Sequence, residues 1–314
     1  MPAAEPTLER FPHPAAAYFA ATRPPFILAS VVPILLGLAW VAWSGQPIDP
    51  LTAVLTVVAG VLLHAAVNVL NDYYDDLNGT DAANDERIFP FTGGSRFIQN
   101  GVLGRDQMRR FGVGLLLGVV IIGLWLIRNS GAELLWLGLF GVLLGWGYSA
   151  PPLSLNSRGL GELAVLAGFS LLPLGAALVQ TGQIEPRLLL VSLPVGLLTA
   201  NLLYINQFPD RKADIQAGKL HWVARLSPRT ARWGYVLLAV LAWGIFLALV
   251  ATGRLPLLAL IALPPAVLSL RAARILLAHA DQPAALAPAI PLTILAMLTH
   301  GALLSLALVI DALL

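Results

Sequence analysis

The side chains best suited to chemistry lie in residues 68–81, which read NVLNDYYDDLNGTD and directly follow an apolar run. This stretch carries four carboxylates and three side-chain amides, namely Asp72, Asp75, Asp76, Asp81, Asn68, Asn71 and Asn78. On a helix, Asn71, Asp72 and Asp75 share one face with Asn68, because they follow it at i+3, i+4 and i+7. Oxygen groups this dense repel one another unless a hard cation such as Mg²⁺ or Ca²⁺ lies among them. The stretch therefore predicts a divalent-cation site at the end of a helix.

A second acidic cluster ends another apolar run, with Asn206, Asp210 and Asp214 spaced four residues apart. Pro209 lies inside this run and favours a break in the helix there. The two Asn-rich helix ends, each opening into a carboxylate-bearing loop, suggest a duplicated helical unit. Two such clusters facing each other would suit two Mg²⁺ ions that bridge a diphosphate, since Mg²⁺ takes few protein carboxylates and completes its shell with phosphate and water.

Cationic groups for the outer oxygens of a diphosphate stand in the same loops as the acids. Arg96 in GGSR, Lys219 in AGK and Arg225 are the candidates. Gly93 and Gly94 would let backbone N–H groups approach a phosphate.

Several polar residues have two readings that the sequence leaves open. His64 lies one helical turn before Asn68 and either lines a cavity or is an ordinary packed histidine; His300, deep in the last apolar run, is similarly ambiguous. Tyr148 stands beside SAPP at the end of an apolar run and either faces the cavity or does not. His221 is expected in a surface loop. The motif DDLNGTD also has the composition of a simple turn.

The elements that must position these groups are membrane helices. The chain is 58% hydrophobic and only 11% charged, against roughly 25% charged residues in soluble domains. Cysteine is absent, which excludes disulfides and thiol chemistry, and the formal net charge of +2 is too small to indicate nucleic-acid binding. We expect a cytoplasmic N-terminal segment over residues 1–25 and one transmembrane domain over residues 26–314.

A bilayer core takes about 20 apolar residues as helix. The predicted fold is all-α, a polytopic bundle around an apolar cavity. Nine candidate spans are counted: about 26–45, 51–71, 108–127, 133–149, 161–180, 187–207, 233–251, 255–272 and 285–312.

The basic residues orient this bundle. With the N-terminus in the cytoplasm, all but three of the 19 Lys and Arg residues fall on the cytoplasmic side, the exceptions being Arg128, Arg187 and Arg254. Such an asymmetry is what the positive-inside rule requires. We therefore expect a multi-pass inner-membrane protein whose N-terminus and active site face the cytoplasm.

The chain resembles the UbiA superfamily of intramembrane prenyltransferases at these motifs. The resemblance rests on the nine spans, NDxxD at 71–75, DxxxD at 210–214, and segments 148–162 and 217–225. It implies Mg²⁺-dependent transfer of a polyprenyl group from an isoprenyl diphosphate to an aromatic acceptor. The third aspartate, Asp81, gives NDYYDxxxGxD, which is more similar to the menaquinone-pathway branch that prenylates 1,4-dihydroxy-2-naphthoate. The second motif, NQFPDRKAD, departs from that branch by one residue and by Pro209.

The resemblance also implies roles for individual residues. Metal ligation and catalysis would fall to Asn71, Asp75, Asp210 and Asp214, with Asp72 and Asp81 as further ligands or their supports. Phosphate and substrate binding would fall to Arg23, Asn68, Arg96, Tyr148, Asn206 and Lys219. The apolar cavity would accept the isoprenoid tail and exclude water, and the Tyr148 ring would stabilise the allylic cation through its π face.

Other functions stay open from the sequence. The same chemistry on 4-hydroxybenzoate or homogentisate is the nearest alternative. A divalent-cation or solute transporter would also place acids in a helical bundle, although nearer the midplane of the membrane. A lipid-head-group phosphotransferase is a third possibility. The expected partners are the two substrates and the lipid bilayer, with no obligatory protein partner.

Overall fold

The computed structural model describes residues 4–314, so the first three residues of the predicted N-terminal segment lie outside it. Its regular elements are helices. The α-helices are α1 (Pro14–Ala21), α2 (Pro24–Trp43), α3 (Pro50–Leu77), α4 (Thr80–Ala83), α5 (Arg105–Ser130), α6 (Glu133–Ser149), α7 (Gly161–Thr181), α8 (Pro186–Gln216), α9 (Trp222–Arg225), α10 (Pro228–Ala251), α11 (Ala266–His279) and α12 (Ala289–Leu313). Three 3₁₀ turns join them: η1 (Leu155–Ser157), η2 (Leu257–Ala262) and η3 (Pro283–Leu286).

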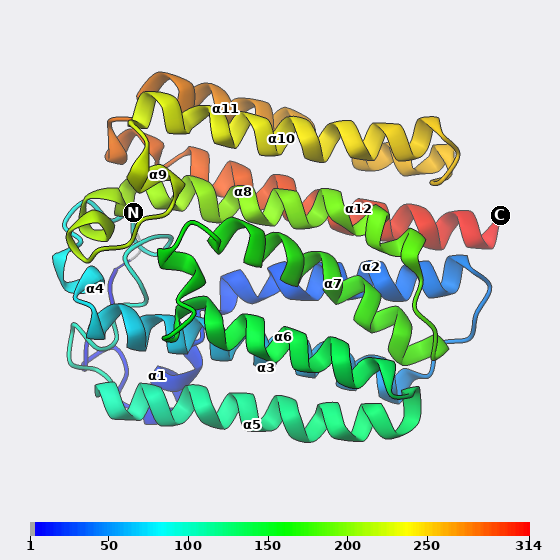
Figure 1. Cartoon of the computed structure of the whole chain (residues 1–314), viewed down its shortest axis with the longest axis horizontal. Helices are drawn as coiled ribbons and strands as arrows, with labels where there is room; N and C mark the ends of the chain where they lie inside the picture. Colours follow the sequence, from blue (N-terminus) through cyan, green and yellow to red (C-terminus); the bar gives the residue numbers. More distant parts are fainter. Residues whose placement is uncertain (1–3) are drawn as a thin grey trace.

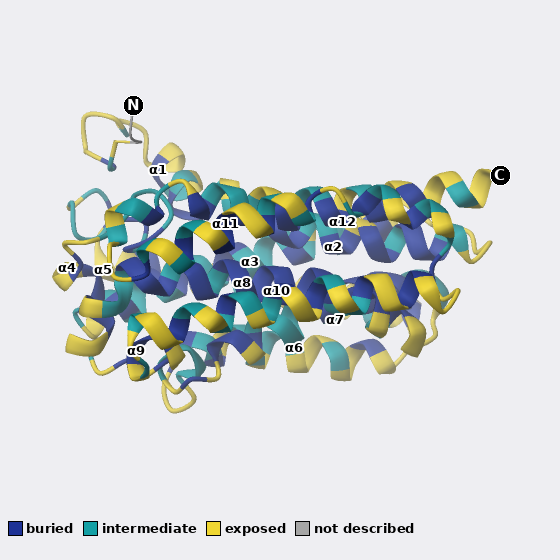
Figure 2. Cartoon of the chain, turned by 90° about the horizontal axis from the view of Figure 1, so that it is seen from above, coloured by how far each residue is buried: buried dark blue, intermediate teal, exposed yellow. Residues whose placement is uncertain are grey.

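The long helices lie side by side in one bundle, with α4, α9 and the N-terminal residues at one end and the C-terminus at the other (Figure 1). The ribbon coloured by burial shows buried stretches mainly toward the inside of the bundle and exposed stretches mainly along its outside (Figure 2). The exposed side chains include large apolar ones such as Ile121 and Trp136, each 69% exposed. Helices that satisfy their own backbone and turn apolar side chains outward are what a bilayer requires. The prediction of an all-helical membrane protein is confirmed.

The count of nine spans is approximate. Within residues 4–314, eight helical segments are long and apolar enough to cross a bilayer. The remaining predicted span, 133–149, forms α6, an apolar helix of 17 residues that packs beside α3 and α7. The predicted span 255–272 is divided, because η2 precedes α11.

Helices α3 and α8 carry the two acidic clusters and are unusually long, with 28 and 31 residues. At 1.5 Å per residue they extend about 42 and 46 Å, beyond the roughly 30 Å of hydrocarbon. The prediction that Pro209 breaks the helix is wrong, because α8 continues from Pro186 to Gln216. Close packing against neighbouring helices lets membrane helices tolerate an internal proline, and Pro209 is itself buried. Both clusters are thus held on the last turns of continuous helices.

Candidate active site

The two acidic clusters meet at Lys219. Its Nζ lies 2.7 Å from Asp75 Oδ1 at the end of α3 and 3.3 Å from Asp214 Oδ1 at the end of α8. Burial opposes the charged form of Lys219, but the carboxylates of Asp75 and Asp214 outweigh it and raise the pKa of the ammonium above its usual value. Lys219 is therefore a fixed cation between carboxylates that are remote in the chain.

The α8 carboxylates have further partners. Asn84, just after α4, donates from Nδ2 to Asp210 Oδ1 at 2.5 Å. His221 lies 3.0 Å from Asp214 Oδ2 through Nε2, while its Nδ1 accepts from the Ala224 N–H at 3.2 Å. Because Nδ1 accepts, Nε2 carries the proton and donates to Asp214. The expectation that His221 is a surface residue is wrong, since only 2% of it is exposed.

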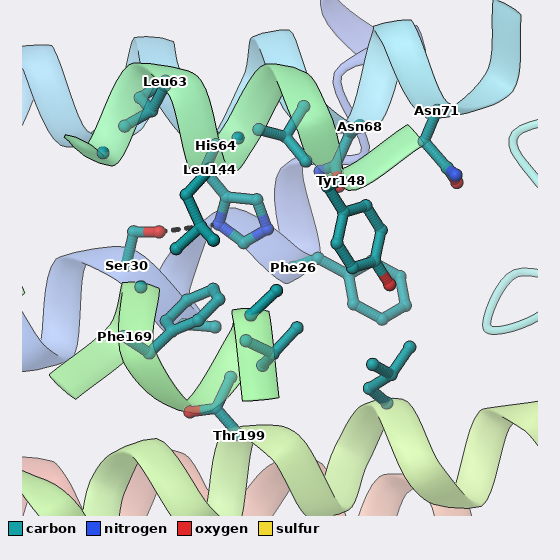
Figure 3. A pocket seen from close by; sticks show the side chains of 18 of the residues that line it. Phe26, Ser30, Leu63, His64, Asn68, Asn71, Leu144, Tyr148, Phe169 and Thr199 are labelled. Atoms are coloured by element: carbon teal, nitrogen blue, oxygen red, sulfur yellow. Dashed lines mark hydrogen bonds between the residues drawn. The ribbon is translucent and has the colours of Figure 1, made fainter. Parts of the chain in front are cut away.

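A cavity of about 450 Å³ opens at this end of the bundle and continues between the helices. Ten of the predicted site residues line it: Arg23, Asn68, Asn71, Asp75, Asp81, Tyr148, Asn206, Asp210, Asp214 and Lys219. Deeper in the bundle its wall is mainly apolar, with Leu144 of α6 and Phe169 of α7 among the lining side chains (Figure 3). The arrangement combines a charged mouth with an apolar interior.

Two predicted site residues, Asp72 and Arg96, are not part of the cavity lining. Asp72 is buried and accepts a bond from the Ser95 N–H at 3.2 Å. Arg96 donates from Nη1 to the Asp81 carbonyl oxygen, and burial lowers the pKa of its guanidinium. Both residues thus lie behind Asp81 and the loop around Ser95, and neither faces the cavity itself.

Asp81 follows α3 and brings a further carboxylate to the cavity. It is buried against Gly94, where an added Cβ would come within 2.3 Å of Asp81 Oδ2, so only glycine fits there. Burial, with the nearby charges of Asp75 and Asp72, raises the pKa of Asp81 well above its usual value. Gly93 and Gly94 adopt φ values of +75° and +72°, as expected of glycines in a tight loop.

Oxygen donors at the cavity fit a metal that arrives with phosphate. Within the described residues, no group of three or more His, Cys, Asp or Glu is already arranged around one point. Four buried oxygens that have no hydrogen-bond partner belong to residues that line the cavity: Asp81 Oδ2, Asn84 Oδ1, Asn206 Oδ1 and Gln207 Oε1. Mg²⁺ typically needs only one or two protein carboxylates beside phosphate and water. The donor set is therefore suited to Mg²⁺.

The remaining predicted residues are held by their own contacts. Arg23 donates from Nη2 to the Phe91 carbonyl oxygen at 3.0 Å, and its guanidinium lies 4.7 Å from the centre of the Phe26 ring. Asn68 donates to the Thr22 carbonyl oxygen at 3.0 Å. Asn71 donates to Ser149 Oγ at the same distance. Each side chain is oriented before any substrate arrives.

Sequence reasoning missed the contacts that Asn84 and His221 make at this site. Asn84 and His221 hold the α8 carboxylates, and no spacing rule links them to α8. His64, for which the sequence left two interpretations open, lines the cavity. Arg225, expected beside the phosphate, is exposed and donates to the Leu220 carbonyl oxygen instead. His300 is fully buried and bonded to the Ala262 carbonyl oxygen.

Comparison with known proteins identifies relatives. Residues 30–309 match the UbiA prenyltransferase family. The 1,4-dihydroxy-2-naphthoate octaprenyltransferase of Escherichia coli (strain K12) is 31% identical over 226 residues, covering 69% of this chain and 70% of that protein. The structure of a digeranylgeranylglyceryl phosphate synthase matches with a TM-score of 0.63 and 18% identity, over 95% of this chain and 98% of that one. A UbiA homologue from Archaeoglobus fulgidus, bound to GPP and Mg²⁺, matches with a TM-score of 0.59 and 14% identity, over 92% and 99%.

Proposed function

Because the chain belongs to the UbiA prenyltransferase family and is a membrane enzyme that transfers prenyl groups, we propose its substrates and site. The donor is an isoprenyl diphosphate and the acceptor is 1,4-dihydroxy-2-naphthoate, so that the product is a precursor of menaquinone. The acceptor assignment is supported by the E. coli relative of that name and by the third aspartate, Asp81. Residues 26–314 form one prenyltransferase domain behind the segment 1–25, which agrees with the family match over 30–309.

The diphosphate binds at the charged mouth of the cavity. Asn71, Asp75, Asp81, Asp210 and Asp214 would hold two Mg²⁺ ions there, a role supported by their shared place in the cavity lining, by the unpartnered Oδ2 of Asp81 and by the A. fulgidus homologue bound to GPP and Mg²⁺. When bound, Mg²⁺ neutralises the charge that develops on the leaving diphosphate.

Protein cations act on the same diphosphate. Lys219 moves from its two carboxylates to a phosphate oxygen, and Arg23 contributes a second guanidinium-to-phosphate contact. Arg96 and Asp72 act indirectly in this proposal, because they support Asp81 and its loop and do not line the cavity. Asn206 supplies an amide oxygen at the cavity wall.

The apolar part of the cavity holds the isoprenoid tail and excludes water, which would otherwise capture the allylic cation. Tyr148 lines the cavity and projects into it from the end of α6 (Figure 3). Its ring face stabilises the positive charge. Asn68, on the face of α3 that carries Asn71, contacts the acceptor. We propose that this mouth lies on the cytoplasmic side of the inner membrane, an orientation that the positive-inside pattern supports.

The observation that carries the proposal is the meeting of Asp75 and Asp214 at one ammonium, at the mouth of an otherwise apolar cavity. The test is to incubate purified protein with Mg²⁺, a labelled isoprenyl diphosphate and a panel of aromatic acceptors, and to identify products by mass. Prenylated 1,4-dihydroxy-2-naphthoate is the expected product. A product only with 4-hydroxybenzoate or homogentisate would replace the acceptor, and no prenyl product with any acceptor would overturn the proposal.

A further inference from the structure

His64 is a polar side chain in the apolar part of the cavity. It projects from the middle of α3 among Leu63, Leu144 and Phe169 (Figure 3). Its ring meets the Phe169 ring edge to face, with the centres 5.5 Å apart. A polar group at membrane depth is costly, so it is commonly retained for a function.

A hydrogen bond fixes the orientation of this ring. Ser30, a buried residue of α2, places its Oγ 2.7 Å from His64 Nδ1. Anchoring one ring nitrogen determines what the other nitrogen does. In Figure 3 the second nitrogen, Nε2, points away from Ser30 toward the side of the cavity where Tyr148 and Phe26 lie. No hydrogen bond from a described residue reaches Nε2, so this nitrogen is available to a ligand in the cavity.

Other histidines of the chain differ from His64 in this respect. His221 uses both ring nitrogens, one with Asp214 and one with the Ala224 N–H. His300 has a free Nε2, but it is fully buried and is not part of the cavity lining. Among these three, His64 alone combines an anchored nitrogen with a free nitrogen that faces the cavity.

The position of His64 along α3 matches the place of an acceptor. Asn68, Asn71 and Asp75 follow it at i+4, i+7 and i+11 on one face of the helix. Asn71 is therefore about 10 Å and Asp75 about 16 Å further toward the mouth. With the diphosphate held at Asp75, as proposed above, its prenyl chain would enter the cavity past Asn68 and His64, so the attacking aromatic ring would lie beside these two residues.

The chemistry of the two flanking residues indicates the class of acceptor. Asn68 uses its Nδ2 on the Thr22 carbonyl oxygen, which leaves its Oδ1 free to accept a hydrogen bond. Asn68 and His64 are one helical turn apart on one face of α3, with Cβ atoms about 5–6 Å from each other. Their polar atoms can therefore reach two hydroxyl groups of one aromatic ring system. Two hydrogen-bond acceptors placed side by side in this way suit an acceptor with two hydroxyl groups, such as a 1,4-dihydroxyarene.

We propose that His64, oriented by Ser30, is a catalytic residue that binds one hydroxyl of a 1,4-dihydroxyarene acceptor through Nε2 and takes its proton during prenyl transfer. This inference rests on the function proposed above. In this proposal Nδ1 carries the ring proton and donates to Ser30 Oγ, so that Nε2 keeps the lone pair that accepts the hydroxyl. A general base within hydrogen-bond reach of the acceptor typically contributes about 10²–10⁴-fold to the rate.

The step balances with the two substrates alone. The bond between the prenyl carbon and the diphosphate oxygen breaks, and its electron pair leaves with the diphosphate. A π-electron pair of the ring forms the new C–C bond at the carbon beside the hydroxyl, while the O–H pair forms C=O and the proton passes to Nε2. The released diphosphate takes the proton from the ring carbon at the new bond, and the Nε2 proton returns to oxygen, which restores the aromatic ring and the neutral imidazole.

Variants of His64 and Ser30 distinguish the role of His64 in orienting the acceptor from its role in taking the proton. His64→Asn keeps an amide for Ser30 but has nothing at the place of Nε2, so we expect kcat to fall about 10²-fold or more. His64→Gln places an amide near Nε2 and is expected to restore the acceptor KM but not kcat. Ser30→Ala, which leaves the imidazole in place, should cost about tenfold in kcat/KM for the acceptor. The KM for the isoprenyl diphosphate should stay within about twofold in all three.

Ser192→Ala is the matched control for Ser30→Ala. Ser192 is also a buried helical serine, but it is not part of the cavity lining, and its hydroxyl donates to the Leu188 carbonyl oxygen of its own helix at 2.7 Å. Its loss should leave both KM values and kcat near those of the wild type. Retention of the folded state is checked for every variant by size-exclusion chromatography in detergent.

The decisive comparison uses a 1,4-dihydroxyarene in which the hydroxyl that would bind His64 is replaced by a methyl ether. The wild type and His64→Asn should turn over this ether at similar low rates. With the free diol, the two rates should differ about 10²-fold. The inference is overturned if His64→Asn keeps the wild-type kcat and pH profile with the diol. It is also overturned if the turnover rates of the two proteins differ as much with the ether as with the free diol. Failure of the wild type to prenylate any phenol would instead overturn the proposed function.

Discussion

The ends of α3 and α8 carry the same kind of residues but are neutralised differently. On α8, Asp214 contacts both Lys219 and His221, and Asp210 accepts from Asn84. On the α3 side, Asp75 shares Lys219, while Asp72 and Asp81 each keep one buried oxygen without a partner. Of these two residues only Asp81 lines the cavity, so on the α3 side it offers an unsatisfied carboxylate oxygen that a divalent cation would satisfy.

The two ends also exchange partners. Asn84, from the loop after α3, holds Asp210 of α8, and Lys219, from the loop after α8, holds Asp75 of α3. Each cluster is thus completed by the loop of the other cluster. Substitutions that remove a carboxylate of one cluster, or one of these crossed contacts, can therefore measure how far the two clusters depend on each other for activity.

The largest effect is expected from removing one carboxylate on either side. Asp75→Ala and Asp210→Ala should each lower prenyl transfer by about 10³-fold or more, because charge stabilisation of the leaving diphosphate is lost. Labelled product is measured by mass. Asp76→Ala is the control, because Asp76 is adjacent but lies outside the cavity and pairs with Arg105 at 2.5 Å. Near-normal turnover by either cavity variant would contradict a shared site.

A smaller effect is expected from the shared cation. Lys219→Ala should raise the KM for the isoprenyl diphosphate about 10- to 100-fold, as expected for loss of one charged hydrogen bond. The KM for the acceptor should change less. Steady-state kinetics with each substrate varied in turn measures both values. Lys212→Ala is the control, since this exposed lysine pairs only with Asp85 and Glu86 among the described residues. A larger change in the acceptor KM would remove Lys219 from the phosphate site.

Asp81 tests the asymmetry of the two sides directly. Asp81→Asn should raise the Mg²⁺ concentration for half-maximal activity about tenfold, the lower end of effects seen at metal sites. The same change should raise the thermal midpoint of the metal-free protein, because burial beside Asp75 and Asp72 disfavours the charged form of Asp81. Magnesium titration and thermal unfolding in EDTA are the measurements. A lower midpoint would mean that the Asp81 charge is already compensated.

The smallest effect is expected at the neutral crossed contact. Asn84→Ala leaves Asp210 in place but removes its amide partner, which should cost about three- to tenfold in kcat/KM. Combining Asn84→Ala with Lys219→Ala shows whether the two crossed contacts are coupled. Simple additivity of the two losses would indicate that the sides act independently.

Local patterns predicted the membrane bundle and the residues at both helix ends, because hydrophobic runs and helical spacing are visible in sequence. The helix break at Pro209 was wrong, because packing overrides the local preference of proline. The buried position of His221 and the bond from Asn84 to Asp210 depend on contacts across the bundle, which spacing along one element does not contain. Asp72 shares a helical face with Asn68 by its spacing, but the loop at Ser95 covers it.

The crossed partners also bear on biosynthesis. Asp75 and Asn84 are translated and inserted well before Asp210 and Lys219 exist, because chains emerge from the N-terminus. Until the second loop arrives, the first half of the chain presents carboxylates at the water interface with no ammonium to meet them. The mouth is therefore incomplete until α8 and the loop after it have been made, and a nascent chain halted after α7 lacks the residues that close it.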